Sequence, residues 1–334
     1  MSAGVDSLPR SRAGITDALG TWARHNVWTL GLTGLLVAFI AVTKLLQPDY
    51  GPDAIQGLAI SILPIAFAAV AQAIVVISGG IDLSVGSMMA LASVTSAVLM
   101  KDQSDLFGVA VVIGVLGLGL LVGAINGSLV VITKVPDIVV TLAMSFVWAG
   151  TALLILNTPG GGAAPWLMAS ISGPLGSPWL PRALVLLAVI VGAVWLPLRR
   201  STRGLTLYAL GSSPLAAFRS GVAVGPTKIL AYMLTGFFSA LGGLALTATG
   251  GVGAPVPGSY TLQSVAAIVL GGVSLAGGRG GVLGPIIAVI VLALVRTDLF
   301  FASVDPNWST AIQGAILIGV VMFGSILAMR KVRA

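Results

Sequence analysis

Long runs of apolar residues, interrupted by glycine, proline and polar residues, make up most of this chain. A helix that crosses a bilayer needs about 20 consecutive residues that are mostly apolar. The pattern therefore predicts about ten membrane-spanning helices, at 28–46, 54–78, 82–100, 107–132, 138–157, 182–198, 228–249, 260–276, 281–297 and 309–329. Segments rich in glycine and proline separate several of these helices, which agrees with the assignment. The expected fold class is an all-α integral membrane protein.

Composition supports this assignment. Hydrophobic residues make up 57% of the chain, charged residues make up 8%, and the mean hydropathy is +1.07. A soluble domain carries about 25% charged residues, so this chain has too few to cover a surface that faces water. The expected organisation is a cytoplasmic segment at 1–27, a single transmembrane domain at 28–329 and a cytoplasmic tail at 330–334.

The basic residues predict the orientation. With the N-terminus inside and ten spans, 13 of the 17 lysines and arginines fall on the cytoplasmic side. Cytoplasmic loops of membrane proteins carry such an excess. The net charge of +7 is therefore explained by topology rather than by nucleic-acid binding, and both termini are expected in the cytoplasm.

Several kinds of chemistry are absent from the sequence. There is no cysteine, the single histidine is His25, and all ten acidic residues are aspartates, so no metal site is expected. No phosphate-binding P-loop motif and no catalytic constellation occurs, so we expect neither an ATPase nor another enzyme. Coupled carriers usually need ionisable groups within the bundle, and only Asp82 and Asp137 approach that position.

Glycines recur at four-residue spacing at Gly119, Gly123 and Gly127. Such faces allow close contact between helices in lipid, and we favour contacts within one subunit over a dimer seam. A second pattern, G-G-[I/V]-x-L-x-x-G, occurs at 79–86 and again at 271–278. Paired glycine interruptions point to a transport region, although chance similarity competes in a glycine-rich chain.

Polar residues within or beside the spans are the candidates for a translocation path. Asp82 follows two glycines, and it either caps the next helix or lines a cavity. The uncharged groups either line a wet path for a neutral polyol or sugar, or bond neighbouring helices. Trp148 lies too deep for an interfacial anchor and is a candidate stacking surface. The complete candidate set is Gln72, Asp82, Asn126, Thr141, Ser145, Trp148, Gln263 and Ser264.

One long basic loop, at about 199–228, lies on the predicted cytoplasmic side. Ser212 or Ser213 can cap a short helix with Pro214 at its first position, ending near Ser220 before Gly221. This helix either docks on a partner or lies in the headgroup layer. The candidate coupling residues are Gly211, Ser212, Ser213, Pro214, Ala216, Ala217, Arg219, Ser220 and Gly221.

Three motifs together resemble a known family. They are ISGGIDLSVG at 77–86, GAING at 123–127 with KVPDIVVTL at 134–142, and AAIVLGGVSLAGGRG at 266–280. The chain resembles, from about residue 55 onward, the membrane-spanning permeases of bacterial ABC importers for sugars, the ribose-type branch. The stretch at 211–221 resembles that family's loop that docks on the ATPase.

The resemblance implies a type II ABC importer-like bundle in the bacterial inner membrane. Two permeases, identical or paralogous, would pair with separate ATPase subunits, which bind ATP and Mg, and with a periplasmic binding protein for the sugar. No cofactor is expected on this chain. The resemblance also implies alternating access, in which closure of the ATPases biases a bundle with two states.

The sequence departs from the family at two places and leaves two rivals. Ser212, Ser213 and Pro214 stand where relatives often carry Asn and Glu, and Gln263 stands where an acid is common. One rival is the same architecture with another solute, such as a branched-chain amino acid or nucleoside. The other is a self-sufficient secondary carrier.

Overall fold

The computed structural model describes residues 27–305 and a few positions between 308 and 322. The predicted N-terminal segment, the tail at 330–334 and most of the predicted tenth span at 309–329 lie outside the described residues. Within the described part, seven helices are long and apolar enough to cross a membrane. They are α2 (Val27–Leu46), α3 (Pro52–Ile77), α5 (Asp105–Thr133), α6 (Asp137–Ile155), α8 (Arg182–Arg200), α11 (Val224–Gly250) and α13 (Leu283–Phe301).

Two predicted spans are shorter than expected. The helix expected at 82–100 begins three residues later, as α4 (Val85–Met100), because residues 78–84 form a turn. The helix expected at 260–276 ends six residues early, as α12 (Tyr260–Leu270), because Gly271 and Gly272 break it and Gly272 has a φ of +79°. At 16 and 11 residues, neither helix is as long as a full span.

Smaller elements complete the chain. A short helix α7 (Pro165–Ile171) and a two-stranded antiparallel hairpin, β1 (Pro174–Leu175) and β2 (Ser177–Pro181), precede α8. The expectation of an all-helical membrane protein is confirmed at this level, and the hairpin adds only seven residues of strand. After α8 come two short helices, α9 (Thr202–Ser212) and α10 (Pro214–Arg219).

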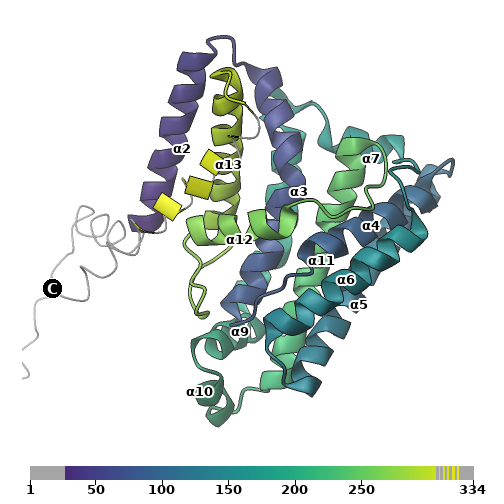
Figure 1. Ribbon diagram of the computed structural model, residues 1–334, viewed down its shortest axis with the longest axis vertical. Helices are drawn as coiled ribbons and strands as arrows, with labels where there is room; N and C mark the ends of the chain where they lie inside the picture. Colours follow the sequence, from purple (N-terminus) through teal and green to yellow (C-terminus); the bar gives the residue numbers. More distant parts are fainter. Residues whose placement is uncertain are drawn as a thin grey trace, which may run out of the picture.

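The helices pack around α3 and α11. Figure 1 shows α2 and α13 side by side, α3 in the middle, and α4, α5, α6 and α11 grouped beyond it. Helices α9 and α10 lie together at one end of the bundle. In the most apolar window of α3, 83% of the residues are buried, against 11% in α2 and in α6. Helix α3 is therefore core, whereas α2 and α6 form the exterior.

The glycine face of α5 packs against α11. A Cβ atom on Gly119 would lie 2.5 Å from the carbonyl oxygen of Gly236, and one on Gly123 would collide with the carbonyl of Tyr232. A Cβ atom on Gly127 would lie 2.9 Å from the Cα of Ile229. The prediction that these glycines serve contacts within one subunit is therefore correct.

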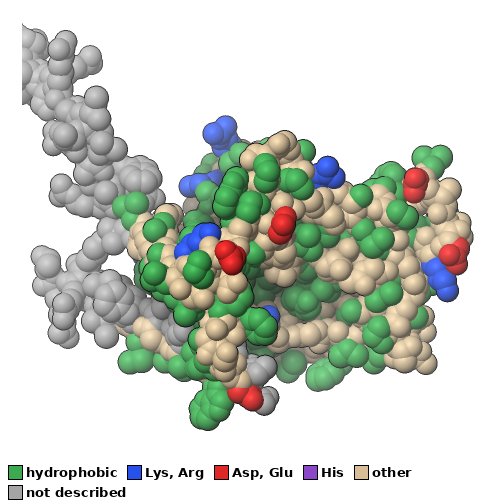
Figure 2. All heavy atoms as spheres, turned by 90° about the horizontal axis from the view of Figure 1, so that it is seen from above, with side chains coloured by type: hydrophobic (Ala, Val, Ile, Leu, Met, Phe, Trp, Pro, Cys, Tyr) green, Lys and Arg blue, Asp and Glu red, His purple; other side chains and the backbone are tan. Residues whose placement is uncertain are grey.

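The surface is poor in charge. Figure 2 shows one face of the molecule, on which hydrophobic side chains and backbone predominate and charged side chains are few. Exposed apolar side chains include Val37 and Ile40 on α2, and Phe146 and Leu154 on α6. Such a surface is stable against lipid and unstable against water.

Candidate functional site

The turn between α3 and α4 is held by a buried carboxylate. Asp82 is fully buried, and its Oδ1 atom accepts hydrogen bonds from the backbone N–H of Ser84 at 2.8 Å and from the Ser84 hydroxyl at 2.6 Å. The N-cap position of α4 is Ser84 rather than Asp82. Asp82 thus fixes the turn that leads into the helix. Its second oxygen, Oδ2, is buried and has no hydrogen-bond partner among the described residues.

Two further helices join this turn through a chain of hydrogen bonds. The Nδ2 of Asn126, on α5, donates to the Ser84 hydroxyl at 2.8 Å. The indole Nε1 of Trp148, on α6, donates to the Oδ1 of Asn126 at 3.1 Å. The chain therefore runs from α6 through α5 to Asp82, and it links three candidates that lie far apart in the sequence.

The first turns of α4 and α12 meet beside this network. The backbone N–H of Gly86 donates to the hydroxyl of Thr261 at 2.9 Å, and that hydroxyl lies 3.4 Å from the carbonyl oxygen of Leu83. Figure 1 shows α12 at mid-height in the bundle, between α13 and α3. Each helix therefore starts inside the bundle after an irregular segment, at 78–84 and at 251–259. In membrane proteins, such irregular backbone occurs where protein buries it or where it lines a cavity.

Thr141 connects the same turn to the start of α6. Its hydroxyl accepts from the backbone N–H of Leu83 at 3.0 Å and lies 2.9 Å from the carbonyl oxygen of Asp137. The hydroxyl has no exposed surface, so these contacts are made away from solvent. Four of the eight path candidates, Asp82, Asn126, Thr141 and Trp148, thus converge on one turn.

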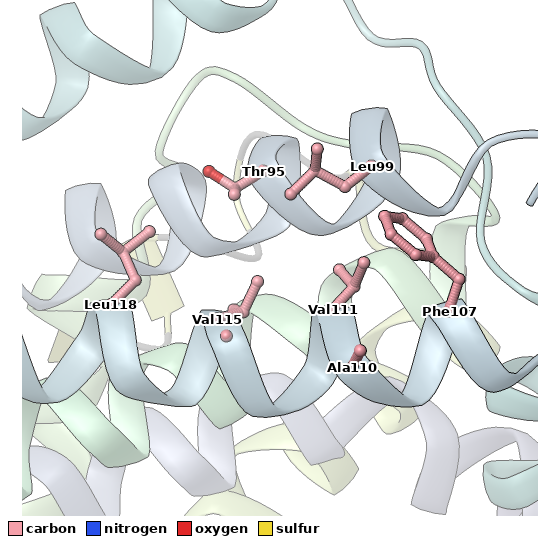
Figure 3. A pocket seen from close by; sticks show the side chains of 8 residues that line it. Thr95, Leu99, Phe107, Ala110, Val111, Val115 and Leu118 are labelled. Atoms are coloured by element: carbon pink, nitrogen blue, oxygen red, sulfur yellow. The ribbon is translucent and has the colours of Figure 1, made fainter.

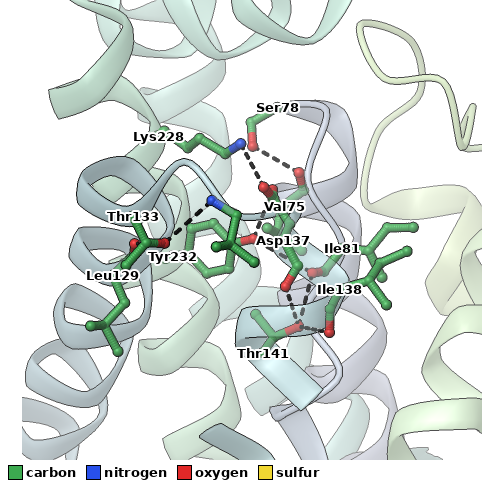
Figure 4. A network of polar contacts seen from close by, with 11 residues as sticks. Val75, Ser78, Ile81, Leu129, Thr133, Asp137, Ile138, Thr141, Lys228 and Tyr232 are labelled. Atoms are coloured by element: carbon green, nitrogen blue, oxygen red, sulfur yellow. Dashed lines mark hydrogen bonds and ion pairs between the residues drawn. The ribbon is translucent and has the colours of Figure 1, made fainter. Parts of the chain in front are cut away.

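A charged cluster lies next to this turn (Figure 4). The Oδ1 of Asp137 forms an ion pair with the Nζ of Lys228 at 2.7 Å, and its Oδ2 accepts from the hydroxyl of Tyr232 at 2.9 Å. The Tyr232 hydroxyl is also 3.5 Å from the carbonyl oxygen of Ile81. Lys228 and Tyr232 are four residues apart on α11 and therefore share one helix face.

The two glycine interruptions meet at the end of α9. The backbone N–H of Gly278 donates to the carbonyl of Ile77 at 2.9 Å. A Cβ atom on Gly211 would collide with that carbonyl and lie 2.6 Å from the Gly278 nitrogen. A Cβ atom on Gly79 would lie 3.3 Å from the Cα of Gly211. The segments that follow α3 and α12 thus pack directly on Gly211, and we call this contact the glycine junction.

A hydrogen bond reinforces the glycine junction. The hydroxyl of Tyr208, on α9, donates to the carbonyl oxygen of Gly280 at 2.8 Å. A tyrosine is protonated at neutral pH, and burial raises the pKa of Tyr208 further, so the phenol is available as a donor.

The predicted short helix in the basic loop is present as α10. Ser213 is its N-cap, and the Ser213 hydroxyl accepts from the backbone N–H of Ala216 at 3.3 Å. Pro214 is the first helical residue, and Gly221 follows the helix with a φ of +83°. Leu215 and Phe218 are exposed, so α10 presents an apolar surface beside the basic Arg219. The structure adds α9, which the sequence pattern did not predict.

The remaining path candidates lie outside the network. Gln72 is buried on α3, and both atoms of its amide lack hydrogen-bond partners among the described residues. Ser145 and Ser264 donate to backbone carbonyls on their own helices. Gln263 bonds the hydroxyl of Ser259. Among the described residues, none of these four forms a hydrogen bond with the turn that holds Asp82.

A groove of about 350 Å³ lies between α4 and α5 (Figure 3). Leu99, Phe107, Val111 and Leu118 are among the apolar side chains that line it, and Thr95 contributes the one lining hydroxyl. The groove offers almost nothing to a polar solute, so it is separate from the polar network.

Sequence reasoning missed several members of the site. It did not include Ser84, Thr261, Lys228 or Tyr232 among the path candidates, and it noted Asp137 only as an acid near a span end. The one available signal was the spacing of Lys228 and Tyr232, which at i and i+4 places both side chains on the same face of a helix. Neither residue predicts Asp137 as a partner, because that contact joins helices 91 residues apart.

Comparisons with known proteins agree with this architecture. The family model described as "Branched-chain amino acid transport system / permease component" matches residues 54–321. Similar curated proteins include the Autoinducer 2 import system permease protein LsrD of Escherichia coli strain K12, of Escherichia coli O157:H7 and of Shigella flexneri. Each is 30% identical over 312 residues, which cover 91% of this chain and 94% of the relative. No solved structure matches the chain.

Proposed function

This chain belongs to the family of branched-chain amino acid transport system permease components, and on that premise we propose that it is the permease subunit of an ATP-driven importer for a sugar. The family and the seven apolar helices make it a multi-pass protein of the inner membrane. The observation that carries the proposal is the glycine junction. It joins the segment that displays α10 to both interrupted helices.

Helix α10 is the proposed docking element for a separate ATPase. It is short, capped at Ser213 and stopped at Gly221, and it exposes Leu215, Phe218 and Arg219. A groove on the ATPase would bury the two apolar side chains and pair with the arginine. ATP and Mg would bind to the ATPase, so this chain itself would need no cofactor and would perform no hydrolysis.

Movement of α10 would reach the polar network through the glycine junction. Because Gly211 contacts Ile77 and Gly278 without an intervening side chain, a displacement of α9 shifts both interrupted segments together. Packed interiors change between discrete arrangements rather than deforming continuously. The junction therefore suits alternating access driven from one end of the bundle.

The polar network supports a sugar as the solute. Asn126, Ser84 and Thr261 offer uncharged donors and acceptors, and Trp148 offers an aromatic surface. Neutral groups of this kind suit a polyol, and the neighbouring charges of Asp137 and Lys228 are paired with each other. The description of the family names branched-chain amino acids, and the relatives' name specifies autoinducer 2. The proposed translocation path runs past this network.

The wider assembly belongs to the same proposal. We propose that a second permease, either identical or paralogous, packs against α6, because the apolar face of this helix is largely exposed. Ten spans with both termini in the cytoplasm, in a single transmembrane domain, remain our proposed topology. A periplasmic binding protein would deliver the solute from the other side.

Co-purification tests the proposal. The chain would be isolated from native membranes in mild detergent, and its companions identified by mass spectrometry. We expect a P-loop ATPase at about one copy per permease. Uptake into cells would then be measured with labelled ribose, glucose, autoinducer 2 and leucine, with and without an ATPase active-site mutation.

The alternatives give different results. Uptake of leucine alone would indicate that the solute is an amino acid rather than a sugar. Uptake that survives the ATPase mutation but is abolished by a proton ionophore would indicate a secondary carrier. A permease that purifies without an ATPase would also contradict the proposal.

A further inference from the structure

The charged cluster of Asp137, Lys228 and Tyr232 joins three separate parts of the chain. Asp137 is the first residue of α6, and Lys228 lies in the first turns of α11, just after α10. Tyr232 lies one helical turn further along α11 and reaches the carbonyl of Ile81, in the turn between α3 and α4. One carboxylate therefore ties the start of α6 to α11 and, through a tyrosine, to that turn (Figure 4).

The degree of burial makes this ion pair sensitive to geometry. The side chain of Lys228 is 23% exposed, and that of Asp137 is 14% exposed. An ion pair on an open surface is screened by water and contributes little. When a pair is mostly buried, separation leaves two poorly solvated charges, unless the movement also opens the site to water. The pair is thus stable when closed and separates readily only together with a wider opening.

The backbone at Gly80 lies directly against the cluster. A Cβ atom on Gly80 would lie 2.7 Å from the Oδ2 of Asp137 and 3.1 Å from the hydroxyl of Tyr232. The turn between α3 and α4 therefore packs against both the Asp137 carboxylate and the Tyr232 phenol. If α11 moves away, the turn loses the Tyr232 hydroxyl, and the Asp137 carboxylate on α6 loses its two partners on α11.

We propose that Asp137, Lys228 and Tyr232 form a latch that holds this turn closed against α11 and opens when α10 displaces the start of α11. The inference rests on the proposed function, because α10 moves only if a partner docks on it. The latch and the glycine junction contact the turn from different elements, α11 and α9. The latch thus gives the closed state its own stabilising contact, as a two-state bundle requires.

A purely structural role predicts different behaviour. If the cluster only strengthens the fold, its removal lowers thermal stability and leaves the accessibility of the turn unchanged. If it is a latch, removal of the ion pair exposes the turn while the rest of the bundle stays folded. Accessibility of the turn therefore separates the two roles.

A single cysteine reports this accessibility, because the chain contains none of its own. In Ile81→Cys the backbone carbonyl that Tyr232 contacts is retained. The complete complex with its ATPase would be placed in lipid nanodiscs, and the rate of labelling by a water-soluble maleimide measured. The variants are Lys228→Met, Asp137→Asn, Tyr232→Phe and the exchanged pair Asp137→Lys with Lys228→Asp. Lys134→Met is the matched control, because Lys134 is an exposed lysine in the loop before Asp137.

We expect labelling to be several-fold faster in Lys228→Met and in Asp137→Asn, and about two-fold faster in Tyr232→Phe. The exchanged pair should return the rate towards that of the parent, and Lys134→Met should leave it unchanged. Equal rates in the parent and all single variants would overturn the latch. A folded exchanged pair that labels as fast as the single variants would also overturn it.

The same experiment separates this inference from the proposed function. The parent protein should label faster when ATP is added, because ATPase closure would move α10. A parent that never responds to ATP contradicts the importer. A parent that responds to ATP but is insensitive to the ion pair contradicts only the latch. If the charge variants are unstable, Tyr232→Phe still tests the latch, because it removes only one hydroxyl.

Discussion

At the scale of single residues, the interrupted segment between α3 and α4 depends on buried hydrogen bonds. Away from water, a polar group without a partner is costly, so each member of the chain from Trp148 to Asp82 constrains the next. Asn126 occupies the middle of that chain, where it donates to one side chain and accepts from another. An amide suits this position because it carries both a donor and an acceptor.

Asp82→Ala should destabilise the protein and reduce uptake. The change leaves the N–H and hydroxyl of Ser84 without their acceptor, which costs about 1–3 kcal/mol for a buried group. Asp82→Asn keeps an acceptor oxygen and should retain most of the stability and uptake. Thermal unfolding in detergent and a transport assay measure the two effects. If the asparagine variant is as stable as the parent but does not transport, the negative charge itself is needed.

At the scale of elements, close backbone contact replaces the side-chain packing of a soluble core. Helices α5 and α11 approach so closely that Gly119, Gly123 and Gly127 leave no room for a Cβ atom. Because lipid is as apolar as a leucine side chain, association in a membrane relies on such close packing and on hydrogen bonds. The glycine junction uses the same principle to connect α9 to two interrupted segments.

Gly211→Ala should impair transport more than stability. The added methyl group would press on the carbonyl of Ile77 and on Gly278, and crowding of this kind costs about 1–3 kcal/mol. Because this contact transmits the movement of α9, we expect ATP hydrolysis to continue while uptake falls. Gly117→Ala is the control, since a Cβ atom there meets nothing within 4 Å. Uptake at the parental rate in both variants would rule out the junction as a transmitter.

Arg219→Glu should weaken docking of the ATPase on α10. The substitution reverses a charge at the end of a helix whose apolar side chains, Leu215 and Phe218, are exposed. We expect normal membrane insertion, and at least a several-fold loss of co-purified ATPase. Arg296→Glu is the control, because Arg296 is an exposed arginine in a different helix, α13. An unchanged ATPase yield in Arg219→Glu would argue that α10 lies in the headgroup layer instead.

At the scale of the whole molecule, the bundle has two ends of different character. Helix α8 ends with two arginines, α9 carries Arg203 and α10 ends with Arg219, and α9 and α10 lie together at one end of the bundle (Figure 1). Lys101 follows the last residue of α4, and Arg182 begins α8, at the end of that helix opposite its two terminal arginines. Under the proposed topology this basic end faces the cytoplasm, as expected for an inner-membrane protein.

Labelling of single cysteines should reveal this orientation. Because the chain is free of cysteine, Lys101→Cys and Lys134→Cys each introduce one exposed thiol. In intact spheroplasts we expect an impermeant maleimide to modify position 101 and to spare position 134. Inside-out vesicles should give the opposite result. Modification of both positions from the same side would contradict the proposed topology.

The sequence was sufficient wherever the physical signal is local. Apolar runs predicted the seven long helices, because length and hydropathy decide whether a segment crosses a bilayer. Ser213, Pro214 and Gly221 predicted α10, because capping depends on neighbouring residues. The family was recognisable from motifs, and the family comparison agrees.

Only the tertiary structure decided which polar groups meet. Asp137 and Lys228 are 91 residues apart, and Gly86 and Thr261 are 175 apart, so no periodicity links them. The hydropathy pattern also failed to predict that α4 and α12 are short, because apolar residues continue across both glycine breaks. Hydropathy is a property of each segment on its own. The polar network, the glycine junction and the latch depend instead on how helices from distant parts of the chain pack together.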